Sequence, residues 1–526
     1  MAAGDVISTP DTAGDVTLGS APAGDVRLWK NANSDFDVFT KDQSYASFIN
    51  ANYEGMLVYE PYFDSRTSWY EGTALFYKDA YSIKTDPDKI HDGATIDWAL
   101  RGADGSLCYI PWGDPYDQYA ADIGNSDFRD NWIDYVVQKL TNVPGYEGVF
   151  IDDVNLGVSR VACGSDTGPR CDPDTAANCP IDPRTGQVMT NADWKRYFVE
   201  FLEQVRAAIP EKLIAHNSIW FIVDLDDPYL GRELAAADII QMEQGFVDNG
   251  LTGGAGKYSW LKKMEFVDLV HSYGNVVIDR DEGAFTQQLQ NYGLANFLLL
   301  NNGQDFYDPE RHSMPDDWWT GYEAELGPAT GEMYIWNGLW RRDFQSGVAL
   351  VNPPGDTGTV AGIDLGSTYT DLYGQQHSSV TLEDKQGLIL RTTIDCLDSE
   401  RFVPQADDDC DGFSTTPSPT PTPGPTAPAS QDVTWGDNDC RDGVTPVDSL
   451  FVLRGDAGLP TNTGGCPPMG AEIEVLGASP HIWGDVDCTG DMNPADSLKL
   501  LRFDAGFGVA SEAGCPPIGG EVAVVD

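Results

Sequence analysis

The sequence predicts an α/β fold: a (β/α)8 TIM barrel followed by a small antiparallel β-sandwich, a Pro/Thr linker and an α-helical duplicated module. Short apolar runs alternate with amphipathic stretches from residue 27 to about residue 305, which is typical of a barrel. Short strands separated by turns follow at 330–393. After a stretch rich in Pro, Thr and Ser, a segment repeats with a period of 48 residues, from Trp435 to Trp483.

Eight apolar runs predict the strands of the barrel, because a strand buried on both faces reads as a continuous apolar stretch. In chain order they are 26–29, 55–59, 73–77, 149–151, 213–217, 238–243, 275–279 and 296–301. Between them, 127–140 and 193–209 place apolar side chains on one face and predict amphipathic helices. The alternative is an open doubly wound sheet, but no glycine-rich phosphate loop follows the first run.

The predicted organisation has five parts. They are a loose N-terminal lead at 1–25, the barrel at 26–329, the β-sandwich at 330–395, an acidic turn and Pro/Thr-rich linker at 396–432, and the duplicated module at 433–526. The linker composition predicts an extended, semi-rigid spacer. The lead repeats Ala-Gly-Asp-Val and has neither the basic start nor the apolar core of a signal peptide.

The chain is strongly acidic, with 83 Asp and Glu against 32 Lys and Arg and a formal net charge of −51. This charge argues against nucleic acid and anionic membranes as partners, because both would be repelled. The 14 Trp, 22 Tyr and 21 Phe residues argue against disorder. No stretch approaches the roughly 18 apolar residues of a membrane span.

The ten cysteines indicate disulfides and therefore an extracellular or cell-surface protein. Cys440 with Cys466 and Cys488 with Cys515 bracket the two repeats, Cys396 and Cys410 flank the end of the large domain, and Cys163, Cys171 and Cys179 share one loop, with Cys108 as the distant partner of one of them. A zinc site is the weaker alternative, since no His lies near that loop and no Cys-x-x-Cys spacing occurs.

The run 148–154 ends in two adjacent carboxylates, Asp152 and Asp153. In a parallel barrel, the residues that end the strands meet at the mouth, where such folds keep their chemistry. The expected mouth residues are Glu60, Tyr62, Lys78, Asp79, Asp152, Asp153, His216, Asn217, Glu243, Gln244, Asp279, Asp281, Asn301 and Asn302.

So many acids at one rim suit cleavage of a glycosidic bond, in which one carboxyl protonates the leaving oxygen and a second acts as nucleophile or activates water. Asp152 and Glu243 are the strongest catalytic candidates, and Asp153 is a third. The predicted substrate contacts are Glu60, Tyr62, Lys78, Asn217, Asp279 and the loop residue Trp112, whose ring could pack on a sugar face. A Ser-His-Asp hydrolase is disfavoured, because the chain has no Gly-x-Ser-x-Gly motif and only six His.

Residues 121–126, 128–132, 148–153 and 342–353 resemble bacterial glycoside hydrolase-like barrels, known mostly as hypothetical glycosyl hydrolases. The resemblance covers about residues 26–393. In related barrel glycosidases, such as the α-galactosidase-like ones, the carboxylate that ends the fourth strand is the nucleophile and one on the sixth is the acid/base. The resemblance therefore implies these roles for Asp152 and Glu243, with Asp153 as a substitute nucleophile.

The two repeats place acids at positions 1, 3 and 12 of a calcium loop, a spacing that wraps oxygen ligands around a hard cation. These acids are Asp437, Asp439 and Asp448 in the first repeat and Asp485, Asp487 and Asp496 in the second. Residues 433–520 resemble dockerin modules, which implies structural Ca2+ and a cohesin-like protein as partner. Position 5 departs from the pattern, with Arg441 and Thr489. The alternatives are a disulfide-held helix pair without metal and self-association of the module.

The sequence as a whole favours a secreted glycoside hydrolase that cleaves a poly- or oligosaccharide with two carboxylates and no catalytic cofactor, anchored through the dockerin-like module. The alternative is a non-catalytic extracellular carbohydrate-binding or structural protein built on the same barrel. The distance between Asp152 and Glu243 separates these hypotheses, because a catalytic pair must lie roughly 5 to 10 Å apart.

Overall fold

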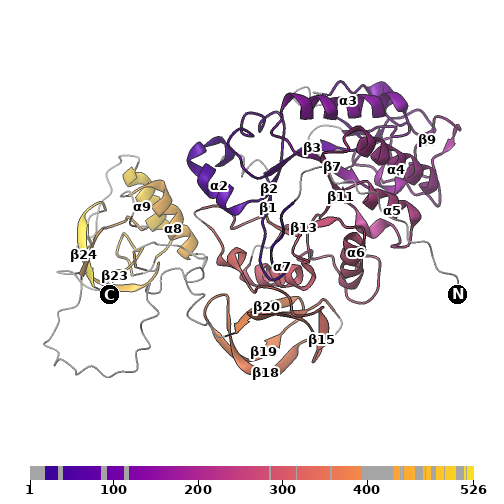
Figure 1. Cartoon of the computed structure of the whole chain (residues 1–526). Helices are drawn as coiled ribbons and strands as arrows, with labels where there is room; N and C mark the ends of the chain where they lie inside the picture. The colour runs from indigo at the N-terminus through magenta and orange to yellow at the C-terminus, as the bar shows by residue number, and fades with distance from the viewer. Residues whose placement is uncertain are drawn as a thin grey trace. The chain divides into compact units, whose positions relative to one another are not determined.

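The computed structural model (Figure 1) describes residues 18–32, 39–84, 92–111, 118–283, 286–315, 317–355, 358–392, 430–438, 440, 444–456, 466–467, 469–475, 481–490, 492–504, 515–516 and 518–525. The chain divides into two compact units, residues 1–410 and 411–526. The division falls within the segment that the sequence predicts to be a linker.

Eight parallel strands form one sheet in the first unit. Their order is β1 (Trp29–Asn31), β2 (Gly55–Val58), β3 (Thr73–Asp79), β7 (Gly148–Val154), β11 (Leu213–Ser218), β12 (Ile239–Met242), β13 (Val276–Asp281) and β14 (Phe306–Pro309). The two edges meet through a parallel bridge between Leu28 and Tyr307, so the sheet is a nearly closed barrel. The predicted eight-stranded barrel is therefore confirmed, and the open doubly wound alternative is wrong.

A compact apolar cluster fills the barrel. It contains Trp29, Leu57, Leu75, Phe150, Leu213, Ala215, Ile239, Val276, Ile278 and Phe306. These residues define which face of each strand points inward, because successive side chains on a strand alternate between its two faces. The residue two positions beyond the last cluster member of each strand therefore lies at the barrel mouth.

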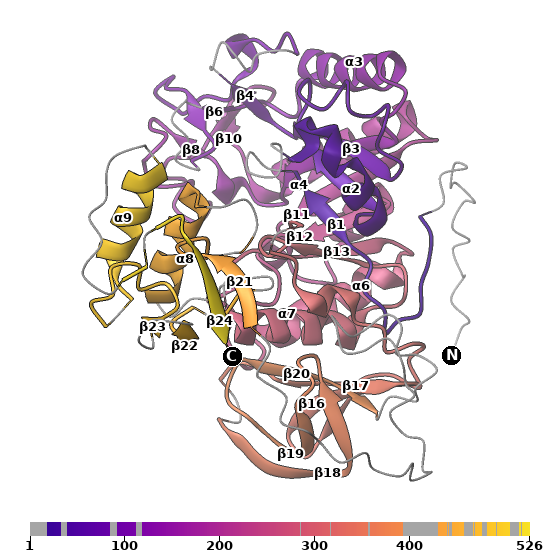
Figure 2. The ribbon, with the colours of Figure 1, turned by 90° about the vertical axis from the view of Figure 1, so that its left-hand side faces the viewer.

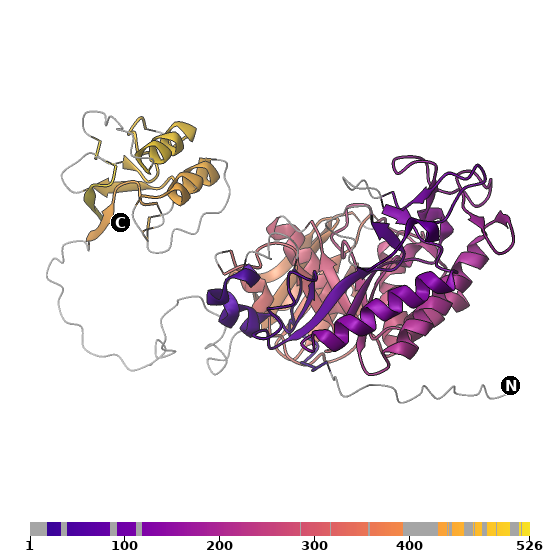
Figure 3. The same cartoon turned by 90° about the horizontal axis from the view of Figure 1, so that it is seen from above.

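Helices cover the outside of the barrel. They are α2 (Ala46–Asn52), α3 (Ser126–Asn142), α4 (Asn191–Ala208), α5 (Pro228–Ala235), α6 (Trp260–Ser272) and α7 (Gln287–Leu300). Both helices predicted from amphipathic periodicity are present as α3 and α4. The side chain of Asn125 caps the start of α3, and Thr190 and Asp193 form a capping box at the start of α4. Trp132 of α3 packs on Phe201 of α4, and Figure 3 shows the two helices side by side.

The prediction of an eighth strand at 296–301 is wrong. This segment is the C-terminal part of α7, and the eighth strand is β14 at Phe306–Pro309. The segment is apolar on all sides because α7 is buried between the barrel and a second sheet, with neighbours on both (Figure 2). A short apolar run by itself does not distinguish a buried helix from a buried strand.

The antiparallel strands expected after the barrel are present and form one six-stranded sheet. Its order is β15 (Tyr334–Trp336), β16 (Leu339–Phe344), β17 (Gly347–Asn352), β20 (Gln386–Thr392), β18 (Val360–Asp371) and β19 (Gln376–Leu382). Strands β17 and β20 pack against α7. Gly387 of β20 permits this close approach, because a Cβ there would lie 2.7 Å from the Cβ of Ala295.

The connections that leave the carboxyl ends of β3 and β7 carry a small four-stranded sheet. It consists of β4 (Ser82–Lys84), β6 (Gln118–Ala120), β5 (Cys108–Tyr109) and β8 (Ala162–Cys163). A disulfide joins Cys108 to Cys163, and a second joins Cys171 to Cys179. The prediction that Cys108 pairs with a cysteine of that loop is confirmed.

The described residues of the second unit form two helices and a four-stranded sheet. The helices are α8 (Pro446–Asp456) and α9 (Pro494–Asp504), and the strands are β21 (Ser430–Thr434), β24 (Glu521–Val525), β22 (Glu472–Val475) and β23 (His481–Ile482). The helices pack together through Val452, Leu500 and the hydroxyls of Ser449 and Ser497, 2.7 Å apart.

The predicted disulfides of the repeats, Cys440–Cys466 and Cys488–Cys515, are both present. Cys396 and Cys410 lie outside the described residues. In the part of the chain that the structure describes, no helix is long and apolar enough to cross a membrane.

Candidate active site

The alternation of side chains brings a ring of polar residues to the barrel mouth. Its members are Asn31, Tyr59, Tyr77, Asp79, Asp152, Asn217, Gln241, Glu243, Arg280 and Asp308. Contacts across the ring confirm this placement: Tyr59 packs on Tyr77 with ring centroids 4.8 Å apart, and the Asn31 backbone amide donates to Oδ1 of Asp308 at 3.3 Å. The mouth is therefore built from the inward face of the strand ends.

Asp152 and Glu243 share one hydrogen-bond donor. Nδ2 of Asn217 lies 2.8 Å from Oδ1 of Asp152 and 3.2 Å from Oε2 of Glu243. The two carboxylate oxygens can lie no further apart than the sum of these distances, about 6.0 Å. The structure thus brings together the two acids that the sequence singles out, at a spacing suited to glycosidic chemistry.

Three donors fix the orientation of Asp152. Besides Asn217, the Tyr77 hydroxyl donates to Oδ2 at 2.7 Å, and the backbone amide of Asp153 donates to Oδ1 at 2.8 Å. Asp153 has a φ of 54°, a left-handed conformation uncommon for a residue with a side chain, and the pairing of β7 with β11 shifts register here. The irregular strand end turns the Asp153 amide toward the Asp152 side chain.

Glu243 follows β12, and its surroundings favour the protonated form of its carboxyl. Partial burial raises its pKa, and the negative charge of Asp152 raises it further. The Asn217 hydrogen bond and the Arg280 cation, whose Nη1 lies 3.6 Å from Oε1, act in the opposite direction. The Glu243 side chain is still 48% exposed, so it can reach a molecule in the mouth.

Arg280 is a mouth residue that sequence reasoning missed. Its guanidinium lies 3.6 Å from Glu243, 3.5 Å from Glu282 and 3.8 Å from Asp308. The sequence analysis selected its neighbours Asp279 and Asp281 because they are acidic. The apolar positions Val276 and Ile278 would have indicated Arg280 as the inward residue, had the inward face of β13 been known.

Asp279 and Asp281 do not lie in the mouth, and the prediction of Asp279 as a substrate contact is corrected accordingly. Both point outward from β13 into the layer beneath the helices, where they are 1% and 0% exposed. His216 is likewise fully buried on the outward face of β11. A substrate in the mouth cannot reach these side chains.

Lys78 and Glu60 are also directed away from the mouth, toward α3. Lys78 pairs with Asp92 at 2.6 Å and lies over the Tyr135 ring. Glu60 accepts a hydrogen bond from the Tyr135 hydroxyl and pairs with Lys139 at 2.8 Å. The predicted substrate contacts through these two side chains are therefore wrong.

The other residues predicted for the site differ in their placement. Asp153 is 7% exposed and faces the opposite side of β7, where its charge raises the already burial-raised pKa of Tyr81. Tyr62 is 58% exposed in the turn after β2, and Trp112 lies outside the described residues. Asn301 caps the end of α7 and donates to the carbonyls of Ala23 and Asp25, so it is not a mouth residue.

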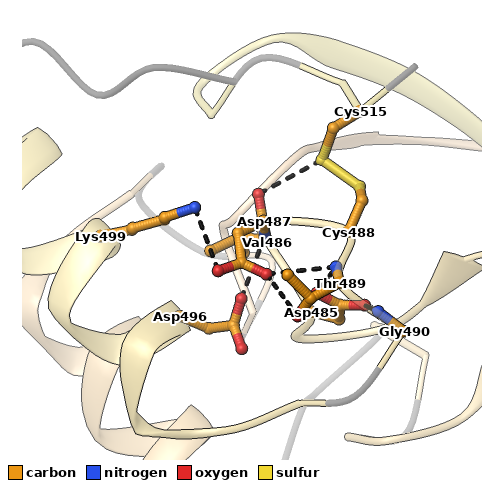
Figure 4. Close-up of a disulfide and its surroundings, with 9 residues drawn as sticks. All are labelled: Asp485, Val486, Asp487, Cys488, Thr489, Gly490, Asp496, Lys499 and Cys515. Carbon is orange, nitrogen blue, oxygen red and sulfur yellow. Dashed lines mark hydrogen bonds and ion pairs between the residues drawn. A yellow bond between two sulfur atoms is a disulfide. The ribbon is translucent and has the colours of Figure 1, made fainter. Parts of the chain in front are cut away.

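The second calcium-loop repeat gathers three buried carboxylates (Figure 4). One oxygen from each of Asp485, Asp487 and Asp496 lies within 4.8 Å of the others. Gly490 donates to Asp485 at 2.7 Å, and Lys499 lies 3.0 Å from Asp487. Three converging carboxylate oxygens are the hard ligands that Ca2+ prefers, so the donor set fits this ion.

The first repeat is described only in part. Asp437 and Asp448 are buried, and Asp439 lies outside the described residues. Asp448 accepts hydrogen bonds from the amides of Asn438 and Thr445, at 2.6 and 2.7 Å. The equivalent Asp496 accepts from the backbone amides of Asp487 and Asn493. Asn493 corresponds to Thr445, so the two loops share this contact, whereas Asp487 lies one position further along its loop than Asn438.

The chain has distant likenesses to solved glycosidases. They include the glycoside hydrolase domain of PelA from Pseudomonas aeruginosa (14% identity, 57% of this chain, 97% of that chain, TM-score 0.33), an α-amylase from Lactobacillus plantarum (13%, 70%, 97%, 0.38) and the GH31 dextranase FjDex31A from Flavobacterium johnsoniae (9%, 71%, 52%, 0.40). These likenesses are too distant to assign a substrate or a mechanism. No curated protein matches the chain.

A sequence model matches residues 56–348, which is more than half of the chain. The matched region runs from β2 into β17 and contains Asp152, Asn217, Glu243 and Arg280. On this match the chain belongs to hypothetical glycosyl hydrolase family 15.

Proposed function

We propose that the barrel hydrolyses an O-glycosidic bond of a poly- or oligosaccharide, with Asp152 as nucleophile and Glu243 as acid/base. The observation that carries this proposal is the Asn217 amide, which bridges both carboxylates and limits their nearest oxygens to about 6.0 Å. Carboxyl groups about 5 to 5.5 Å apart are typical of retaining glycosidases, whereas inverting enzymes need about 6.5 to 9.5 Å to admit water. The spacing favours the retaining mechanism.

In the first step Glu243 donates its proton to the glycosidic oxygen while Asp152 attacks the anomeric carbon. The bond to the leaving alcohol breaks, and a covalent glycosyl ester forms on Asp152. In the second step Glu243, now a carboxylate, takes a proton from water, and the water oxygen displaces Asp152. The raised pKa of Glu243 supports its role as the group that begins the cycle protonated.

Tyr59 and Asn217 are the proposed sugar contacts of the mouth. Tyr59 is 43% exposed and packed on Tyr77, and its exposed ring surface is the proposed contact for the C–H face of a sugar. Asn217 lies between the two carboxylates, where it can also meet a sugar hydroxyl. Tyr62, in the turn after β2, and Trp112 remain proposed contacts.

The C-terminal module is proposed to bind Ca2+ and to anchor the chain. Asp485, Asp487 and Asp496 would hold one ion, and Asp437, Asp439 and Asp448 a second. Ca2+ would neutralise the clustered carboxylates and join each loop to its helix. The exposed Leu450 and Leu453 of α8, and Leu498 and Leu501 at the equivalent positions of α9, support docking to a cohesin-like protein or to a second copy. The four disulfides among the described residues support an extracellular location.

The test is a screen of reducing-sugar release over a broad polysaccharide panel, with the wild type beside Asp152→Asn. Asp238→Asn is a matched control, because Asp238 bonds to Arg206 and the Ile214 amide at the opposite, amino-terminal end of the strands. Release by the wild type and the control, but not by Asp152→Asn, is the expected result. Silence from all three would favour a non-catalytic carbohydrate-binding role.

A further inference from the structure

A buried ionic cluster lies behind Glu243 and takes no part in the mouth. Lys263 of α6 and Asp279 and Asp281 of β13 are each no more than 1% exposed. Removing a charge from water costs several kcal/mol per ion unless other contacts compensate. Apolar side chains would fill the same space at a lower cost in free energy. Lys263 and Asp281 both contact the turn that follows Glu243.

This turn has an unusual backbone. Gln244 and Gly245 both adopt left-handed conformations, with φ of 67° and 49°. The ammonium of Lys263 donates to the carbonyl oxygen of Gly245. Lys263 also lies 5.0 Å from the ring centroid of Phe246, so one side chain of α6 contacts both residues that complete the turn.

Asp281 closes the turn from the other side. A Cβ on Gly245 would lie 2.2 Å from Oδ1 of Asp281. Burial raises the pKa of Asp281 to about 6, and the Tyr307 hydroxyl, the Lys263 cation and the backbone amides of Val247 and Phe246 act in the opposite direction. The Tyr307 hydroxyl donates to Oδ2 at 2.5 Å. On α7, a Cβ on Gly293 would lie 1.5 Å from the same Oδ2. The Asp281 carboxylate thus lies against Gly245 in the turn after β12 and against Gly293 in α7, and it fills the space that a Cβ atom would need at either position.

From these contacts we propose that Lys263 and Asp281 are positioning residues that fix the turn after β12 and so aim Glu243 at Asp152 and Asn217. Glu243 is two residues from the carbonyl that Lys263 holds, and its contact with Asn217 is already long at 3.2 Å. A small relaxation of the turn would break that contact. The inference rests on the proposed acid/base role of Glu243.

The experiment compares two kinds of substrate in the full chain. One is the polysaccharide found by the screen, which needs acid assistance, and the other is an aryl glycoside of the same sugar with a dinitrophenolate leaving group, which does not. In Lys263→Met, kcat on the polysaccharide should fall on the order of 100-fold, as for a misplaced catalytic group. KM and the glycosylation rate with the aryl glycoside should stay nearly unchanged.

A second readout does not need activity. Hydrogen exchange of the peptide at 243–250 should become faster in Lys263→Met, whereas exchange elsewhere in the barrel should not. Arg342→Met is the matched control, because Arg342 is another buried cation that donates to carbonyls, those of Leu298, Leu299 and Asn301, far along the chain from Glu243. If Lys263→Met does not fold, Asp281→Asn and Tyr307→Phe replace it. Both substitutions keep the size and shape of the side chain that packs beside the turn.

Equal losses on both substrates, or unchanged exchange at 243–250, would overturn the positioning role. If the wild type releases no sugar from any substrate, the proposed hydrolase function fails on its own. The exchange measurement would then still decide whether Lys263 and Asp281 hold the turn.

Discussion

The Asn217 side-chain amide donates to Asp152 at 2.8 Å and to Glu243 at 3.2 Å, so one group is hydrogen-bonded to both acids of the barrel mouth. Asn217 is anchored at the end of β11, between the strands that carry the two carboxylates. Two acids this close would repel each other if both were ionised, and the shared donor reduces that repulsion. The geometry of the pair therefore depends on a neutral third residue.

Asn217→Ala should lower kcat/KM on the order of 100-fold, the usual effect of removing one oriented donor from a catalytic site. Asn275→Ala is a suitable control, since Asn275 is also buried but donates to the carbonyls of Leu234 and Ala237. Steady-state kinetics of both variants give the comparison. Equal activities of Asn217→Ala and the wild type would show that the hydrogen bonds of Asn217 do not contribute to catalysis.

The pH dependence of hydrolysis should report Glu243. Because Glu243 must begin protonated and its pKa is raised, activity should be lost on the basic side of the profile, as pH rises through that pKa. The Arg280 cation favours the charged form of Glu243, so Arg280→Met should move the basic limb of the kcat/KM profile to higher pH. A shift to lower pH, or none, would mean that Glu243 is not the group titrating there.

Glu233 offers a prediction about stability. It is 2% exposed in α5, where burial raises its pKa to about 8. The folded protein then binds one more proton than the unfolded chain between the ordinary pKa of glutamate and about 8, so stability should fall as pH rises through this range. Glu233→Gln should remove that loss, at about 1.4 kcal/mol per pH unit.

Thermal unfolding at several pH values measures this difference. The variant and the wild type should have similar Tm at pH 4, and the Tm advantage of Glu233→Gln should grow up to about pH 8 and then level off. A difference that does not vary with pH would show that Glu233 is not buried as a neutral acid.

Calcium should stabilise the second unit through its second loop. Addition of Ca2+ at about 100 times its Kd should stabilise the unit by about 2.7 kcal/mol, by mass action. Asp485→Ala combined with Asp496→Ala should remove the part of this shift that belongs to residues 483–520, as followed by calorimetry of the full chain. Asp437→Ala with Asp448→Ala tests the first loop separately. An unchanged shift in Asp485→Ala combined with Asp496→Ala would dismiss the second site.

The sequence predicts the strands of the barrel better than it predicts their faces. Tyr59, Tyr77 and Arg280 face the mouth, whereas their neighbours Glu60, Lys78 and Asp279, which the sequence analysis selected, face the helices. Each error is a shift of one residue. A strand buried on both faces lacks the polar–apolar alternation that would mark its inward side. The choice between adjacent residues therefore rested only on the chemical type of their side chains.

Asp152, Asn217 and Glu243 lie at the ends of three apolar runs and have the required chemistry, which is why the sequence points to them as mouth residues. The α7 error has the same physical origin as the face errors: residues 297–300 form a continuous apolar run because α7 is covered on two sides. Only the three-dimensional packing distinguishes such a helix from a strand.

The most direct measurement is mass spectrometry of Glu243→Gln after incubation with an aryl glycoside that has a good leaving group. Without the acid/base residue, the nucleophile can still be glycosylated, but the ester is hydrolysed slowly and accumulates. One added sugar is expected on the peptide that contains Asp152, and none in Asp152→Asn combined with Glu243→Gln. Turnover without an adduct, an adduct on Asp153, or a product of inverted configuration would contradict this expectation.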